Sequence, residues 1–244
     1  MQPELKPVRT DDQSFGRGTP YDAGQDTTVI STDSRRVLRN TYMLLALTMV
    51  PTVIGAYIGM ATSSIIMASP IISSLVMLAA VIGLQFAIAA NRNSALGVVL
   101  LLLMTGILGW WLGPILNVAL SMKNGMGLVG YAAVGTGVVF FAMGALAQTI
   151  KRDLGFMGKF LFVGMIALLI AMVANMFLQI PALALTISTL VIVVFSLFLL
   201  YDLQRIIRGG ETNYVIATTG VYMSLFNIFA NLLHLLLALG GEKD

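Results

Sequence analysis

Seven long apolar segments dominate this sequence and limit the class of structure that the chain can form. They cover approximately residues 38–60, 69–90, 94–116, 128–150, 159–180, 181–207 and 214–239. Each has roughly the 20 residues that a helix needs to cross about 30 Å of hydrocarbon. Of the 244 residues, 58% are hydrophobic and only 10% are charged, which is too apolar for a soluble domain of this size. We therefore predict an all-α polytopic membrane protein with a seven-transmembrane-helix bundle over residues 38–240.

Residues 1–37 have a different composition from the rest of the chain. They are polar, rich in Asp, Thr, Gly and Arg, and have no periodic apolar positions. Such a segment cannot bury enough apolar surface to offset the entropy lost on ordering, so we predict a disordered tail. No apolar core follows a basic start near Met1, so we do not expect a signal peptide. The tail should stay on the side of the membrane where the chain is made.

Lysine and arginine are distributed unevenly between the two sets of connections. One set carries nine of them: Arg35, Arg36, Arg39, Arg92, Lys151, Arg152, Lys159, Arg205 and Arg208. The opposite set carries only Lys123 and Lys243. Basic residues accumulate on the cytoplasmic side, so we predict a cytoplasmic N-terminus and a C-terminus outside. These residues serve as topology signals beside the lipid bilayer, and we expect no nucleic-acid partner.

The residues that usually carry catalysis or metal binding are scarce. Cysteine is absent and His234 is the only histidine, which excludes thiol chemistry and a histidine-rich metal centre. A serine nucleophile would need a base, but Ser224 and His234 are ten residues apart on one helix, about 15 Å. The Gly209-Gly210 pair is too weak a signal for a phosphate loop. We predict no catalytic residue, no metal and no cofactor.

Small residues indicate which helices approach closely. Gly55 and Gly59 in the first segment have a four-residue spacing that lets two helix backbones meet in lipid, as do Gly109 and Gly113 in the third. The fourth segment adds four more glycines, Gly130, Gly135, Gly137 and Gly144. We interpret these glycines as packing residues of a compact bundle.

A polar stripe runs along the seventh segment. Gly220, Ser224, Asn227, Asn231 and His234 recur at spacings of 4, 3, 4 and 3, which places them on one helix face. Polar side chains avoid hydrocarbon, so the stripe should face the bundle interior. Two interpretations remain open: hydrogen bonds between helices, or a polar pathway. His234 lies near the outer end of the segment, where we favour an interfacial side chain over a proton relay.

Asp202 is the one acidic residue inside a long apolar segment, near the predicted cytoplasmic end of the sixth helix. It begins a loop motif that contains Arg205, Arg208, Gly209, Gly210 and Glu211. One interpretation is a partly hydrated carboxylate that pairs with Arg205 one turn away. The other is an ionisable gate at the inner end of a polar cavity. Residue chemistry alone leaves both open.

Several motifs resemble one known family. The segment from Tyr201 to Phe229 reads YDLQRIIRGGETNYVIATTGVYMSLFNIF and resembles the closing signature of the Bax inhibitor (TMBIM) family. The segment from Gly106 to Asn117, GILGWWLGPILN, is similar to the family's third-helix motif. The resemblance implies a seven-helix bundle with a central last helix.

The same resemblance implies that the chain could be a calcium leak channel, but this sequence has only part of the residue pattern of such channels. Some family members are pH-sensitive calcium leak channels closed by an aspartate pair on helices six and seven. Asp202 matches the first aspartate, but Ser224 occupies the position of the second, and a serine cannot share a proton as a carboxylate does. In those family members an arginine in helix two holds the aspartate pair closed. This sequence has no counterpart of that arginine, because no Lys or Arg occurs between Arg39 and Arg92.

Two further motifs, RRVLRNTYMLLALT and MVANMFLQIPAL, resemble the bacterial inner-membrane branch of this family. That resemblance implies a modulator and slow substrate of the ATP-dependent protease FtsH, in contact also with its companions HflK and HflC. The tail would be the handle that the protease grips. The alternative is a calcium or cation leak channel, with Asp202, Ser224, Asn227 and Asn231 as pathway or gating residues.

Overall fold

The computed structural model describes residues 31–240, so the predicted tail lies outside the described residues except for its last part, 31–37. The described residues form nine helices, α1 (Thr32–Ala61), α2 (Ser63–Ala68), α3 (Pro70–Ala90), α4 (Ala95–Trp111), α5 (Gly113–Ser121), α6 (Gly125–Thr149), α7 (Gly155–Leu178), α8 (Pro181–Ile207) and α9 (Tyr214–Gly240). Seven stretches within 31–240 are long and apolar enough to span a membrane, with α4 and α5 together as one stretch. The prediction of an all-α bundle with seven spans is confirmed.

The start of the first span and the course of the third differ from the expected ones. α1 begins at Thr32, inside the stretch assigned to the tail, because the Ser31 hydroxyl oxygen accepts a hydrogen bond from the Ser34 N–H at 3.1 Å and caps the helix. The third span is interrupted at Leu112, between α4 and α5. Pro114 lies in the first turn of α5, where its missing N–H costs no helical hydrogen bond.

The expected break between the fifth and sixth spans is present. α7 ends at Leu178, and Gln179 has a left-handed backbone with φ of 52° that reverses the chain. Pro181 then opens α8 in its first turn. The turn thus needs only two residues, and it places α7 and α8 side by side.

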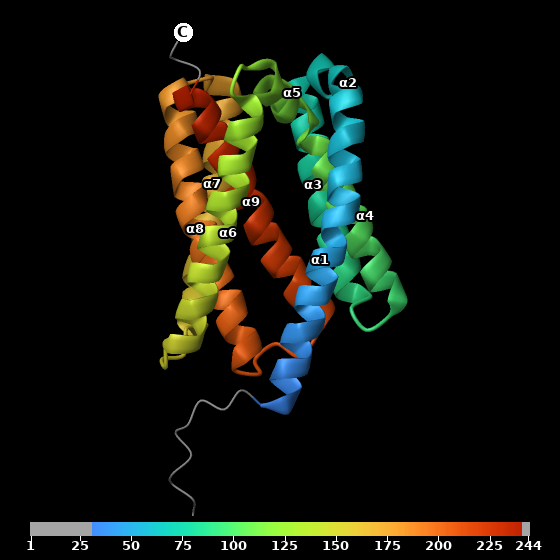
Figure 1. The fold of residues 1–244 in the computed structure, drawn as a ribbon, viewed down its shortest axis with the longest axis vertical. Helices are drawn as coiled ribbons and strands as arrows, with labels where there is room; N and C mark the ends of the chain where they lie inside the picture. Colours follow the sequence, from blue (N-terminus) through green and yellow to red (C-terminus); the bar gives the residue numbers. More distant parts are fainter. Residues whose placement is uncertain (1–30, 241–244) are drawn as a thin grey trace, which may run out of the picture.

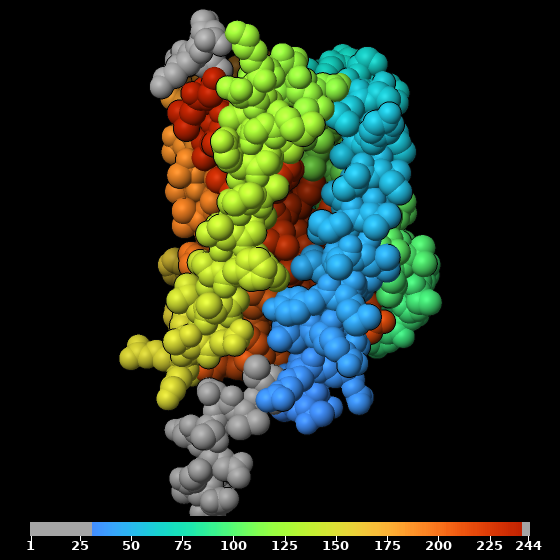
Figure 2. Space-filling model, viewed as in Figure 1, coloured from blue at the N-terminus to red at the C-terminus, as the bar shows by residue number. Residues whose placement is uncertain are grey.

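α9 is the central element of the bundle. It packs against α1, α3, α4, α6 and α8, and in Figure 1 it crosses between the group of α6, α7 and α8 and the group of α1, α3 and α4. Figure 2 shows its atoms between α6 and α1. Tyr222 of α9 is fully buried, and its hydroxyl lies 2.8 Å from the Thr52 hydroxyl of α1. The expected central last helix is therefore present.

α1 and α4 form the most extensive helix pair of the described residues. A side chain at Gly55 would collide with the backbone of Gly106, and one at Gly109 would collide with the backbone of Thr52. A side chain at Gly59 would collide with the backbone of Trp110, and one at Gly113 of α5 would collide with the backbone of Gly59. The predicted packing role is confirmed for these glycines.

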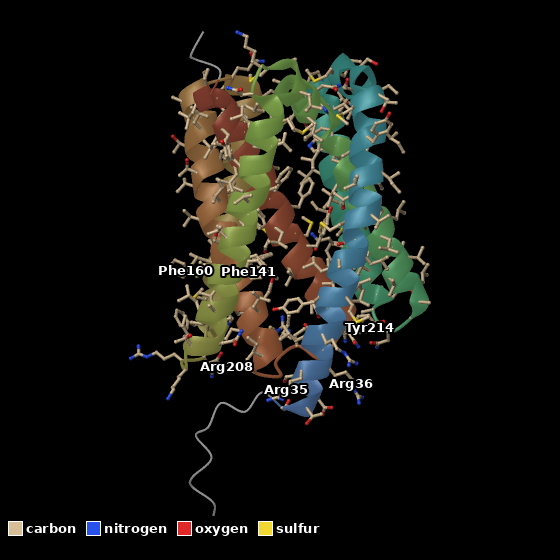
Figure 3. All side chains as sticks on the ribbon, in the orientation of Figure 1. Arg35, Arg36, Phe141, Phe160, Arg208 and Tyr214 are labelled. Carbon is tan, nitrogen blue, oxygen red and sulfur yellow. The ribbon has the colours of Figure 1, made fainter. Side chains whose placement is uncertain are left out.

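The prediction is wrong for part of α6. Among the described residues, no atom of another element lies within 4 Å of the place where a side chain would begin at Gly130 or Gly137, whereas Gly135 contacts Leu232 and Gly144 approaches Leu203. Large apolar side chains cover the outer surface nearby: Phe141 of α6 is 73% exposed and Phe160 of α7 is 83% exposed (Figure 3). This surface suits lipid contact, so Gly130 and Gly137 do not mark a helix contact.

Candidate functional site

The starts of α1, α4, α7 and α9 lie at the same end of the bundle (Figure 1). We refer to this end as the basic end, because it gathers the arginines and lysines of these connections, including Arg35, Arg36 and Arg208 in Figure 3. Asp202 lies on the last turns of α8 at this end. The candidate site is built around its carboxylate.

Gly220 of α9 makes room for the Asp202 carboxylate. A Cβ atom at position 220 would lie only 2.7 Å from the Asp202 Oδ2 atom, which is closer than real Cβ contacts allow. Any larger residue at 220 would therefore push the carboxylate away. The polar stripe of α9 begins with a glycine because α8 places a carboxylate against that face.

The carboxylate opens into a pocket of about 240 Å³ between α3, α8 and α9. The pocket is lined by Gln85, Ile88, Ala89, Asp202, Arg205, Ile206, Glu211, Ile216, Ala217, Thr219 and Gly220. No hydrogen bond or ion pair within residues 31–240 reaches the Asp202 carboxylate. The side chain is half-buried, so the pocket is its access to solvent.

Arg205 pairs with Glu211, so the interpretation in which Asp202 pairs with Arg205 is wrong. The Arg205 Nη2 atom lies 3.3 Å from the Glu211 Oε2 atom, and Arg205 Nε donates to the Gly210 carbonyl at 3.2 Å. The turn explains this choice, because Gly209 adopts a φ of 74° that favours glycine and folds residue 211 back toward α8.

Asn213 fixes the loop after Glu211 at the start of α9. Its Oδ1 atom accepts hydrogen bonds from the N–H groups of Val215 and Ile216, at 3.0 and 3.1 Å. Its Nδ2 atom donates to the Arg92 carbonyl and to the Asn93 side chain in the connection between α3 and α4. One asparagine thus caps α9 and joins two loops.

The other polar residues of α9 do not join the Asp202 pocket. Asn227 and Asn231 line a separate pocket of about 390 Å³ near the other end, and their Nδ2 atoms donate to carbonyls of α9 itself. Ser224 is buried and lines neither pocket. The structure therefore separates Asp202 from the other three predicted pathway residues.

His234 bonds across to the neighbouring helix. Its Nδ1 atom lies 2.9 Å from the Ser188 hydroxyl of α8, and the histidine is half-buried. This contact is a hydrogen bond between two helices, as in the first interpretation of the polar stripe.

Two functional positions escaped sequence reasoning. Gln204 is 2% exposed and bonds three backbone groups of the connection between α6 and α7: the Leu154 N–H and the Ile150 and Arg152 carbonyls. Gln85 contributes an amide to the Asp202 pocket. Both are uncharged polar residues inside apolar segments, and this feature of the sequence could have pointed to them.

The site offers an isolated carboxylate beside an arginine and glutamate pair. Among residues 31–240, Asp, Glu and His do not gather in groups of three that could hold a metal ion. The carboxylate can accept a proton or a cation from the pocket, but no second carboxylate faces it from α9.

Comparisons with known proteins give a consistent result. A family model described as "Inhibitor of apoptosis-promoting Bax1" matches residues 34–241. The chain is 42% identical over 211 residues to the "Modulator of FtsH protease YccA" of Escherichia coli (strain K12), covering 86% of this chain and 92% of that protein. It is 40% identical over 204 residues to an uncharacterized membrane protein of Vibrio cholerae, covering 84% and 90%.

Proposed function

The chain belongs to the Bax inhibitor family, and from that membership we propose that it is a modulator and slow substrate of an FtsH-type ATP-dependent protease in the bacterial inner membrane. The observation that carries the proposal is the 42% identity to the Escherichia coli FtsH modulator across 92% of that protein. By occupying the protease, the chain limits degradation of other membrane proteins. It needs no catalytic residue for this role.

The packing of α1 offers a physical basis for slow degradation. An ATP-driven protease that grips residues 1–37 would extract α1 first. α1 is held by α4, α5 and α9, through the close glycine contacts at Gly55 and Gly59 and the hydrogen bond between the Thr52 and Tyr222 hydroxyls. A chain that is gripped easily and extracted slowly keeps the protease occupied.

We further propose the orientation and the partners that the sequence predicts. The basic end would face the cytoplasm, with the N-terminus inside and the C-terminus in the periplasm. The bundle would contact FtsH together with HflK and HflC in the lipid bilayer. The polar composition of residues 1–37 supports the proposal that the protease grips them, and residues 1–30 lie outside the described structure.

The cation-leak alternative has less physical support. From α9, Gly220 faces Asp202, while Ser224 lines neither pocket. The other carboxylate that lines the Asp202 pocket, Glu211, comes from the loop before α9 and pairs with Arg205. α9 itself supplies no carboxylate that could share a proton with Asp202, as a two-carboxylate gate requires.

The test is the lifetime of the protein after protein synthesis is blocked, in cells with active or inactive FtsH. We expect the full chain to disappear only with active FtsH, and a variant without residues 1–30 to persist. Deletion of residues 241–244 is the matched control and should leave turnover unchanged. Asp202→Asn should also leave turnover unchanged. Equal lifetimes of the full chain in both backgrounds would refute the proposal.

A further inference from the structure

A third pocket lies at the basic end, on the side of α8 that faces the connection between α6 and α7. It has a volume of about 400 Å³, within the range of about 300–1,000 Å³ that small-molecule sites occupy. Tyr201, Gln204, Arg205 and Arg208 line it from α8 and its end, and Asp153 lines it from the connection. The FtsH proposal does not use this pocket, and Arg205 is the one lining residue that it shares with the Asp202 pocket.

The pocket is held in shape by hydrogen bonds. Gln204 binds three backbone groups between Ile150 and Leu154 and fixes one wall. The Arg208 Nη2 atom donates to the Ile150 carbonyl at 3.0 Å, which positions the guanidinium and leaves its other N–H groups available. Positioned donors with spare capacity are what an anion site needs.

Tyr201 lines the pocket next to the start of α7. Its ring lies over Gly158 of α7, where a Cβ atom would come within 2.8 Å of the tyrosine Cζ and hydroxyl oxygen atoms. Because residue 158 is glycine, there is room for the Tyr201 ring near the start of α7. Tyrosine favours such interfacial positions, with its ring in an apolar setting and its hydroxyl in a polar one.

The charges around the pocket favour an anion. Arg205 and Arg208 line it, and the exposed Lys151 and Arg152 stand in the connection that forms its wall. The one acidic lining residue, Asp153, accepts a hydrogen bond from the Gly155 N–H through its Oδ1 atom at 2.9 Å. Glu211 pairs with Arg205. Basic side chains remain in excess.

The neighbouring surface of α7 is apolar and faces outward. Phe156 is 72% exposed and Phe160 is 83% exposed, both within the first turns of α7 (Phe160 in Figure 3). A phospholipid in the leaflet at the basic end could therefore lay its acyl chains along α7 while its phosphate enters the pocket. A soluble phosphate would use only the polar part of this arrangement.

We propose that the Tyr201, Arg205 and Arg208 pocket binds the phosphate headgroup of an anionic phospholipid. The guanidinium of Arg208 and the hydroxyl of Tyr201 donate to the phosphate oxygens, and Phe156 and Phe160 contact the acyl chains. Basic pockets between membrane helices on the cytoplasmic side recognise anionic headgroups through such groups. The proposal goes beyond protease modulation and does not depend on it.

The test titrates purified, detergent-solubilised full-length protein with short-chain phosphatidylglycerol, short-chain phosphatidylcholine and soluble glycerol 3-phosphate, and counts bound molecules by native mass spectrometry. We expect phosphatidylglycerol to bind more tightly than the other two. Arg208→Gln should weaken phosphatidylglycerol binding about five-fold, since one basic residue contributes about that factor near an anionic surface. Its phosphatidylcholine binding should not change.

Arg36→Gln is the matched control, because Arg36 lies at the same end but outside the pocket. It should leave phosphatidylglycerol binding intact. If Arg208→Gln lowers the helix content, Tyr201→Phe replaces it, since that change removes one donor and keeps the ring. Equal losses in the pocket and control variants, no loss in either pocket variant, or equally tight binding of glycerol 3-phosphate would each overturn the proposal.

Discussion

Single glycines decide how closely the helices of this bundle approach, and their roles differ sharply by position. Gly55 of α1 touches the Gly106 backbone of α4, whereas Gly137 of α6 has no neighbour within 4 Å. A methyl group at Gly55 must therefore separate two helices, but the same group at Gly137 meets open space. The contrast allows a matched comparison of one chemical change.

We expect Gly55→Ala to lower the free energy of unfolding by about 1–3 kcal/mol, the usual cost of overpacking a tight contact. Gly137→Ala should be neutral or stabilising by up to about 1 kcal/mol, because alanine favours the helix over glycine. Detergent unfolding of both variants, followed by circular dichroism, measures the difference. Equal destabilisation by both changes would contradict the assigned α1 and α4 contact.

At the residue scale, sequence reasoning succeeded where spacing alone determined geometry. The four-residue spacing in α1 and α4 predicted a real helix contact. The expected packing role failed for Gly130 and Gly137, because the presence of a glycine does not say which face of a helix meets lipid. Sequence reasoning also left open whether Arg205 pairs with Asp202, since the turn at Gly209 that delivers Glu211 to Arg205 is a tertiary detail.

At the scale of elements, the junction between α8 and the connection from α6 to α7 depends on one amide. Gln204 satisfies the Leu154 N–H and two carbonyls, and no other described side chain bonds all three. The sequence predicted the spans on both sides of this junction but not the tie between them. A glutamine in an apolar segment indicates that its side-chain amide has hydrogen-bond partners, but it does not indicate which groups they are.

Gln204→Met keeps the side-chain length but removes these bonds. We expect a loss of about 1–3 kcal/mol, the penalty for leaving buried polar groups without partners. Amide hydrogen exchange should rise first across residues 151–155, where the connection loses its anchor. Gln148→Met serves as the control, because Gln148 is an exposed residue on α6. Unchanged exchange in that connection would contradict the role of Gln204.

At the scale of the whole molecule, the apolar segments fixed the number of spans and the order of connections. The central place of α9 came from the family resemblance, supported by the polar stripe, and the structure agrees. A continuous polar pathway could not be judged from periodicity, because the stripe faces Asp202 at one end and a separate pocket at the other. Which helices close the space between them depends on packing across the entire bundle.

The orientation of the molecule in the membrane is a prediction that the cysteine-free sequence makes simple to test. Single cysteines are introduced as Lys123→Cys, in the connection between α5 and α6, and as Lys151→Cys, at the basic end. A membrane-impermeant maleimide should label the first in cells whose outer membrane alone is permeable, and the second only after the inner membrane is opened. The charge bias of nine against two dictates this order, since basic loops resist translocation. The reverse labelling would place the Asp202 pocket and the proposed phospholipid site at the periplasmic side of the membrane. The N-terminal residues would then lie outside the cytoplasm, and a protease acting there could not grip them.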